Sequence, residues 1–484
     1  MQAWQCRVQW KWSPVFPYCF PSDSSMARQL LIATCFACLS LPAMAEPRAG
    51  EATKVASSRV AATPDLTRQM EPLHRPSTEF RGSLSCSAVA CHGGPRPGVA
   101  DLQVPRGSEY GLWLEYDPHA RAALVLNSES SRRMLEQLQI VKSGVVVDQR
   151  GYENCRACHH AGELPGDRQV LISGGNGCES CHGPANNWIG THFLGDRSVG
   201  QSHQAGMLAL KDLVRRARMC ADCHVGSAHR QVNHDLLAAG HPSLRFEMAW
   251  YHNRLPKHWR PVEPVTDTAF QKQLWRAGQI ATMEASLSLL ESRADTEAND
   301  SPWPEFAEYN CASCHQHIRG NVSRRSGSPR TAMPAWGDWQ YSFIELLDPE
   351  PHDAGNSLDD ITRAMVRFDR PDRDAIRQLR GRVHAMAASF DAPAADMEAR
   401  LYQLAEEYSQ ADKPRGWEAA TQLYLGLIAM CIKDDDPSAR QREAHERLRS
   451  VKRLLMPTVT GGSVESDQAV RDALRRYLQQ HSRL

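Results

Sequence analysis

The last third of the chain repeats apolar positions with the period of an α-helix. One apolar face contains residues spaced three or four apart, namely Trp417, Ala420, Tyr424, Leu427, Ile428 and Cys431. Further helices are predicted at 359–391, 395–410, 437–455 and 466–480, with breaks at Pro414, Pro437 and Gly461-Gly462. The pattern predicts an α-helical domain over residues 356–484. Cys431 on the apolar face is predicted to be a buried, inert thiol.

Residues 78–345 show a weaker pattern of short helices and long loops. A helix is predicted from Thr268 to Arg293, because apolar residues recur along one side of it. Asp117 followed by Pro118 is typical of a helix start. Strand-like runs are few, and the best are 145–147 and 170–172. The predicted fold class is therefore mainly α.

Five pairs of cysteines lie between residues 86 and 315, and each pair is followed directly by a histidine. Four pairs have two residues between the cysteines, and the first pair has four. The motifs are Cys86/Cys91/His92, Cys155/Cys158/His159, Cys178/Cys181/His182, Cys220/Cys223/His224 and Cys311/Cys314/His315.

This spacing is the attachment pattern of c-type haem. Two thiols three residues apart lie on one face of a helical turn, so both can form thioethers to one porphyrin edge, and the next residue can place an imidazole under the iron. Paired cysteines can also bind zinc, but zinc ribbons need no trailing histidine. Histidine is 20 of 484 residues, so five trailing histidines arise by chance with a probability of roughly one in ten million. The sequence predicts five haem c groups per chain.

The N-terminus predicts export. From Met26 the chain has a short basic region, an apolar stretch and Ala43-Met44-Ala45, which together form a secretory signal peptide over residues 26–45. Residues 1–45 are predicted to be absent from the mature protein, with cleavage after Ala45, and residues 46–77 form a polar, flexible leader. A periplasmic or otherwise exported protein agrees with the cofactor, because bacteria attach haem c outside the cytoplasm. No later segment reaches a transmembrane length.

The balance of charge changes when the cofactors are counted. The chain has 56 basic and 56 acidic residues, which gives no electrostatic case for nucleic acid. Each ferric haem with two ionised propionates adds about one negative charge and each ferrous haem about two, so the loaded protein is net acidic by roughly five to ten charges. A basic redox partner is favoured. The sequence gives no signal for the oligomeric state.

The second axial ligand of each iron decides between a carrier and an enzyme. Ten histidines outside the motifs lie between His92 and His317. His119, His192, His234 and His241 are the favoured distal ligands. His160 and His317 follow their motif histidines too closely to reach the same iron, but they could reach a neighbouring one. His258 and His229 are reserves, His203 and His252 are expected to face solvent or propionates, and a methionine ligand such as Met248 stays open. Arg215, Arg216 and Arg218 either pair with propionates or form a solvated helix face.

Several of these segments resemble a known family of exported multihaem cytochromes c, related to the nitrifier tetrahaem cytochrome that accepts electrons from hydroxylamine oxidoreductase (cytochrome c-554-like). The resemblance rests on the first motif with its four-residue spacer, Asp-Pro-His119-Ala-Arg-Ala, Cys-Glu-Ser-Cys-His182-Gly-Pro, Asn-His234-Asp with Gly-His241-Pro, and Glu305-Phe-Ala-Glu-Tyr-Asn-Cys311. It covers about residues 78–320. It implies mostly bis-histidine haems stacked for electron transfer, with His119, His192, His234 and His241 as distal ligands. The chain departs from the family in having five motifs and not four.

The leading functional prediction is an exported electron-transfer protein that relays electrons between redox partners. The alternative is a multihaem oxidoreductase that acts on a small nitrogen or sulfur species at one five-coordinate haem, with a surplus histidine such as His258 or His252 as proton donor. The motif of pentahaem nitrite reductases, with lysine in place of the motif histidine, is absent from the sequence. A third class is a zinc-bound structural or partner-binding module.

Overall fold

The computed structural model describes residues 80–94, 107–161, 175–195, 199–260, 263, 267–295, 303–311, 336–347, 357–388, 390, 397–410, 417–431, 448–449, 451, 454–455 and 467–481. The predicted signal peptide and leader lie outside the described residues.

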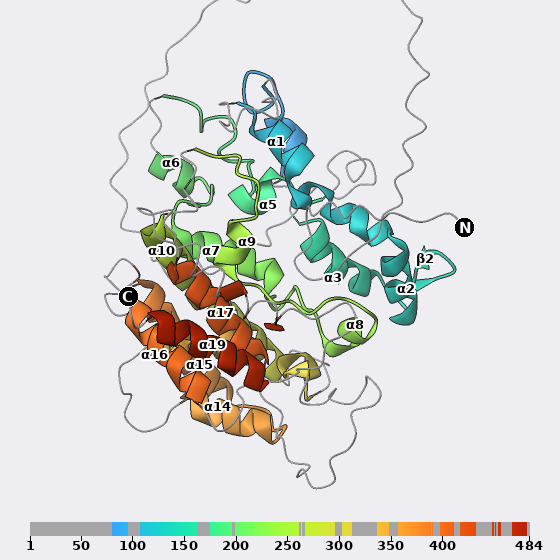
Figure 1. Cartoon of the computed structure of the whole chain (residues 1–484). Helices are drawn as coiled ribbons and strands as arrows, with labels where there is room; N and C mark the ends of the chain where they lie inside the picture. Colours follow the sequence, from blue (N-terminus) through green and yellow to red (C-terminus); the bar gives the residue numbers. More distant parts are fainter. Residues whose placement is uncertain are drawn as a thin grey trace, which may run out of the picture. The chain divides into compact units, whose positions relative to one another are not determined.

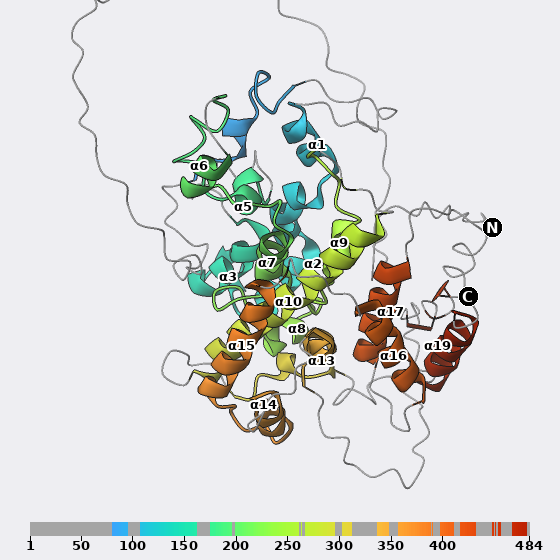
Figure 2. The same ribbon diagram turned by 90° about the vertical axis from the view of Figure 1, so that its left-hand side faces the viewer.

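The described part of the chain is mainly helical, which confirms the predicted fold class (Figures 1 and 2). Up to residue 311 its elements are η3 (Ser83–Cys86), α1 (Glu109–Tyr116), η4 (Pro118–Asn127), α2 (Glu129–Gln137), β1 (Val141–Lys142), β2 (Val145–Val146), α3 (Gln149–His159), α5 (Cys178–His182), α6 (Val199–Gln204), α7 (Leu213–His224), α8 (His234–Ala238), α9 (Met248–His252), α10 (Thr268–Ala294) and η5 (Phe306–Glu308). After residue 336 they are α12 (Asp338–Tyr341), α13 (Ile344–Leu347), α14 (Ser357–Val366), α15 (Arg373–Ala388), α16 (Met397–Gln410), α17 (Trp417–Cys431) and α19 (Asp467–His481).

The short elements follow the local sequence signals. Asp117 caps η4, because its side chain accepts a hydrogen bond from the backbone N–H of His119 at 2.9 Å and Pro118 occupies the first position. Strands β1 and β2 pair antiparallel as the two arms of a hairpin, with Val141 opposite Val146. Both turn residues, Ser143 and Gly144, have positive φ, as a tight hairpin turn requires. The predicted strand at 145–147 is thus confirmed for Val145–Val146, and 170–172 lies outside the described residues.

Helix α10 is the element on which the others pack. It begins after Asp267, whose side chain accepts from the N–H of Phe270 at 2.9 Å. The prediction of a helix over 268–293 is therefore confirmed to within one residue. Of its predicted inner side, Leu274, Ala277, Ala281, Leu287 and Leu290 are almost fully buried, and Phe270 is partly buried. Helix α10 contacts α7 and α9 as well as α15 and α17.

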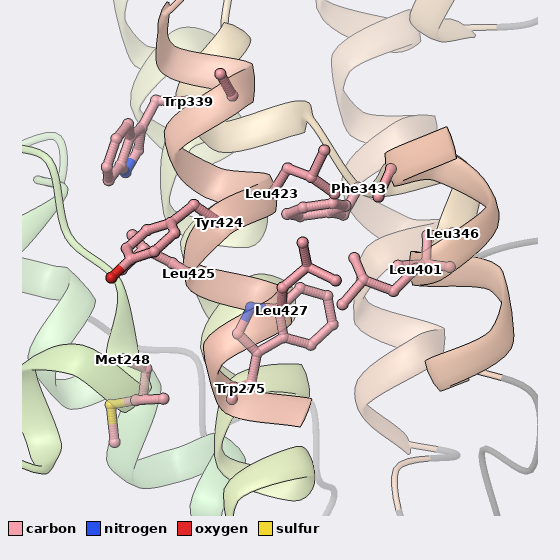
Figure 3. Packing of buried hydrophobic residues seen from close by; sticks show 14 of the residues in the cluster. Met248, Trp275, Trp339, Phe343, Leu346, Leu401, Leu423, Tyr424, Leu425 and Leu427 are labelled. Atoms are coloured by element: carbon pink, nitrogen blue, oxygen red, sulfur yellow. The ribbon is translucent and has the colours of Figure 1, made fainter. Parts of the chain in front are cut away.

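Trp275 of α10 lies in the larger apolar cluster, which also takes residues from α7, α9, α16, α17 and α19. Its indole is fully buried and packs edge-on against Phe343, with ring centres 5.1 Å apart. Figure 3 shows Trp275 with Leu427 of α17 and Leu401 of α16. Gly426 allows this approach, because a Cβ there would lie only 3.2 Å from both the Trp275 ring and Leu401.

The predicted single helix over 359–391 is wrong, since the chain forms two helices, α14 and α15. Phe368 adopts a left-handed conformation (φ 61°), and Pro371 disfavours helical geometry in the residue before it. The break lets Met365 of α14 and Ile376 of α15 enter one cluster with residues of α10. Helices α16, α17 and α19 agree with the predicted segments to within a few residues. The side chain of Cys431 and most of 437–455 lie outside the described residues.

The apolar clusters include residues on both sides of the predicted boundary between 345 and 356. The separation into a motif-bearing domain (78–345) and a helical domain (356–484) remains a prediction about independent folding. Within the described residues, no helix is both long enough and apolar enough to span a bilayer.

Candidate metal centres

Three of the cysteine motifs form the last turn of a helix. Helices α3, α5 and α7 end at His159, His182 and His224, so each Cys-x-x-Cys-His sequence is helical and its two thiols share a face. Of the fifth motif the structure describes only Cys311, which is exposed; Cys314 and His315 lie outside the described residues.

The first motif departs from this helical arrangement at Cys91. Helix η3 ends at Cys86, and the spacer turns back on itself, because the N–H groups of Cys91 and Gly93 both donate to the Ala88 carbonyl, at 2.8 and 3.0 Å. Cys91, which is predicted to hold a haem, is exposed, whereas Cys86 is partly buried. The four-residue spacer places this second cysteine beyond the helical turn that aligns the thiols of the three helical motifs.

Every described motif histidine has a second histidine ring close to it. The ring centres lie 6.1 Å apart for His92 and His192, 6.4 Å for His159 and His241, 6.4 Å for His182 and His258, and 6.0 Å for His224 and His119. Three of the pairs cross at 71–83°, and the first pair is inclined by 15°. The partners come from distant parts of the sequence, so the fold brings them together.

This spacing fits a metal ion between the two rings. A metal–nitrogen bond is about 2 Å long and the centre of an imidazole lies about 1 Å from its nitrogen, so two coaxial ligands place their ring centres about 6 Å apart. All four pairs agree with this distance. The histidines therefore fit a bis-histidine haem at each of the four described motifs.

Hydrogen bonds fix the orientation of five of the eight rings. Their Nδ1 atoms contact oxygen acceptors: His92 with Glu109 Oε2 at 3.1 Å, His119 with Asp117 Oδ1 at 2.8 Å, His159 with the Ala122 carbonyl at 3.2 Å, His192 with the Ile189 carbonyl at 2.9 Å, and His241 with the Pro242 carbonyl at 2.8 Å. Carboxylate and carbonyl oxygens can only accept hydrogen bonds, so in each of these rings the proton lies on Nδ1. The lone pair on Nε2 is left for a metal, which is the usual arrangement around metal-bound histidine.

Burial favours the neutral form of five of the eight paired imidazoles, and the neutral form is the one that binds a metal. Burial lowers the pKa of His182 and of His224 to about 4. It also lowers the pKa of His159, His241 and His258.

The structure places three of the four predicted distal ligands opposite a motif histidine. His119, His192 and His241 each face a motif histidine. His234 lies elsewhere: its ring packs against Phe306 at 5.6 Å, and its N–H donates to Glu305 Oε1 at 2.8 Å, just before the fifth motif.

His258, which the sequence favoured only as a reserve, faces His182. Nothing in its flanking residues, Lys257 and Trp259, marks it as a ligand, so only tertiary structure finds it.

The structure corrects the predicted surroundings of His252, Arg216 and Arg218, because their side chains have partners within the protein. His252 was expected to face solvent or a propionate, but it is buried and accepts from Nη1 of Arg216 at 2.9 Å. Arg216 also pairs with Glu263 at 3.0 Å, and Arg218 pairs with Glu284 at 2.6 Å. Both arginines therefore neutralise protein carboxylates.

Cysteines of different motifs lie next to one another. The thiol of Cys86 in the first motif lies close enough to that of Cys178 in the third to lower its own pKa to about 7, and Cys223 in the fourth motif likewise lowers the pKa of Cys158 in the second. Cys181 of the third motif lies within electrostatic range of Cys220 of the fourth. The attachment edges of the four motifs are therefore adjacent in the order first, third, fourth, second.

Comparison with known proteins agrees with this geometry. Residues 86–183 match the family model described as cytochrome c554 and c-prime. The matched segment contains the first three motifs and His119 and is shorter than the 78–320 over which the resemblance was expected. No curated protein and no solved structure matches the chain.

Proposed function

We propose that this chain is a c-type cytochrome, because residues 86–183 match the family model of cytochrome c554 and c-prime, and that it carries five covalent haems and relays electrons between redox proteins outside the cytoplasm. Bound haems would supply one-electron redox chemistry. The cysteines of the five motifs would hold them, with each motif histidine as the proximal ligand. At the first motif the thioethers would form on the partly buried Cys86 and the exposed Cys91.

The observation that carries the proposal is the facing histidine at all four described motifs. A haem with histidine on both faces has no free coordination position for a substrate and is typical of a low-potential electron carrier. The 6.0–6.4 Å ring separations support His192, His241, His258 and His119 as the distal ligands of the first, second, third and fourth haems. The same pairs disfavour the alternative of an oxidoreductase with an open haem at these four positions.

The fifth haem would be held by Cys311, Cys314 and His315, with His234 as its distal ligand. Two contacts support this assignment. The ring of His234 packs on Phe306, and Glu305 Oε1 accepts from the N–H groups of both His234 and Ala307. Helix α8 is thereby held against η5, only a few residues before Cys311.

The contacts between motifs support a linear order for the relay. Thiol contacts give the order first, third, fourth, second, as described above. A chain of hydrogen bonds supports placing the fifth motif after the second in this order. Gln231 forms two hydrogen bonds with Asn154 of α3, and its side-chain oxygen accepts from Arg293 at 3.3 Å. Arg293 also pairs with Glu308 of η5 at 2.6 Å.

Export and partner choice complete the proposal. The signal peptide at 26–45 with cleavage after Ala45 agrees with periplasmic attachment of haem c. The acidic charge of the loaded protein favours a redox partner with a basic docking face.

The haem content of the purified exported protein tests this proposal. A pyridine haemochrome assay, with intact mass measured in parallel, is expected to give five haems per chain and an N-terminus at Glu46. A Cys311→Ala/Cys314→Ala double variant is the matched control and is expected to give four, because thioether attachment needs the thiols. A wild-type protein without haem c would refute the function outright.

A further inference from the structure

Two of the cysteine motifs contain an acidic residue between their cysteines, and each acid is held by residues that link its motif to another motif. In the four Cys-x-x-Cys-His motifs the intervening pairs are Arg-Ala, Glu-Ser, Ala-Asp and Ala-Ser, so Glu179 and Asp222 stand out. These belong to the third and fourth motifs, which are the middle members of the order first, third, fourth, second. Haem attachment requires no particular residue at these positions.

Glu179 connects the third motif to the segment that enters the first. The Glu179 residue is 3% exposed, and its carboxylate accepts from the N–H groups of Arg81 at 3.0 Å, Gly82 at 2.6 Å and Ala185 at 2.6 Å. Arg81 and Gly82 directly precede η3, which ends at Cys86. A carboxylate with this many backbone donors is fixed in position, because both of its oxygens are engaged and only acceptor atoms satisfy N–H groups.

A second hydrogen bond and a thiol contact close the same junction. The N–H of Cys178 donates to Oγ of Ser83 at 3.2 Å, and the thiols of Cys178 and Cys86 lie close to each other. Helix α5 and the segment from Arg81 to Cys86 are thus joined at three points. The distance between the attachment edges of the first and third motifs depends on these contacts.

Asp222 connects the fourth motif to the second through Arg230. The carboxylate of Asp222 pairs with Nη1 of Arg230, and Nε of the same guanidinium donates to the carbonyl of Ala157 at 2.7 Å. Ala157 lies between the cysteines of the second motif. Arg230 is 7% exposed, and its planar fork can serve both motifs at once, which a lysine ammonium on a flexible stem does less well. The thiols of Cys158 and Cys223 are in contact beside this bridge.

We propose that Glu179 and Asp222 are positioning residues that fix the spacing of two haem pairs, the first with the third and the second with the fourth, and thereby set the electronic coupling within each pair. The inference rests on the proposed pentahaem relay and assigns a role within it to residues that hold no haem themselves. Small displacements matter at such sites, because supporting contacts determine the geometry of the groups they hold.

The test compares Glu179→Gln and Asp222→Asn in the full-length holoprotein with matched controls. Glu129→Gln and Asp360→Asn remove an exposed carboxylate from α2 and α14, far in sequence from any motif. Low-temperature electron paramagnetic resonance (EPR) measures the magnetic interaction between neighbouring ferric haems. Glu179→Gln is expected to weaken the interaction of the first and third haems only, Asp222→Asn that of the second and fourth only, and the controls neither. Unchanged interaction in both variants at full haem content would overturn the proposal, and so would equal changes in both pairs, which indicate general loosening.

A second measurement starts with the wild-type protein, and that part of it does not depend on whether a variant folds. Hydrogen exchange of the wild-type holoprotein, followed by mass spectrometry on peptides around residues 81–82 and 185, is expected to show protected amides. In Glu179→Gln their exchange is expected to rise by about tenfold or more, because an amide NH₂ replaces one acceptor. If these wild-type amides exchanged as fast as unprotected amides, the proposal that Glu179 holds residues 81, 82 and 185 would be overturned. A haem-free protein would refute the relay, whereas the amide protection at Glu179 would still be measurable.

Discussion

Replacing His258 with alanine is expected to convert one of the five proposed haems from low spin to high spin. The ring of His258 faces His182 at 6.4 Å, whereas the residues proposed to attach this haem and bind its iron, Cys178, Cys181 and His182, stay in place. The iron would then lose its sixth ligand, and a high-spin ferric EPR signal of about one spin per chain is the expected result. Added imidazole is expected to restore the low-spin state by occupying the space left by the side chain.

His229→Ala is the control for this substitution, because His229 is exposed on the surface after α7. It is expected to leave all haems low spin. If His258→Ala also stayed fully low spin at five haems per chain, His258 would not be the distal ligand and the pairing of the third haem would be wrong.

Trp275→Ala is expected to lower the free energy of unfolding by about 3–5 kcal/mol, the usual cost of truncating a large buried aromatic residue. Trp275 is fully buried and packs against Phe343 and the Leu401–Gly426 contact of α16 and α17. The remaining helices cannot collapse into the space without moving α17. Denaturant unfolding followed by far-ultraviolet circular dichroism measures the change.

Val145→Ala on the exposed hairpin provides the comparison for Trp275, since the Val145 residue is 63% exposed. It is expected to change stability by less than about 0.5 kcal/mol. A Trp275→Ala protein within about 1 kcal/mol of the wild type would contradict the central place of α10 in the core.

The same unfolding measurement on the wild type tests the predicted domain boundary. Two separate unfolding transitions would support independent folding of 78–345 and 356–484, and one shared transition would argue against it.

The features that could be predicted well from the sequence are those encoded locally. Helix α10 has an apolar side that repeats over its whole length and an aspartate cap, so its bounds follow from the residues themselves. The three motifs that end α3, α5 and α7 could likewise be identified from the sequence, because the attachment pattern of haem c fixes the spacing of three residues within a stretch of five. His119, His192 and His241, which the sequence predicts as distal ligands, each face a motif histidine in the structure.

The features that could not be predicted depend on contacts between distant segments. His258 looks like any other histidine until the fold places it beside His182. Glu179 and Asp222 look like arbitrary residues between two cysteines until their partners at residues 81–82 and at Arg230 are known. The exposure of Cys91 follows from the turn at Ala88, which the cysteine spacing alone does not specify.

The wrong prediction of one helix across the break between α14 and α15 has a different cause, because the sequence does contain a local signal for this break. Pro371 follows closely on Phe368, where the chain turns left-handed. The helical periodicity on both sides outweighed that signal in the prediction of one continuous helix.

Histidine on both faces of every haem would make the protein a carrier of electrons that does not turn over a substrate. EPR of the purified ferric wild-type protein at low temperature, with haem content measured on the same sample, tests this arrangement most directly. Bis-histidine ligation throughout predicts five haems per chain and low-spin signals alone. A high-spin ferric signal from the wild type would reveal an open iron and would contradict the carrier role in favour of an oxidoreductase.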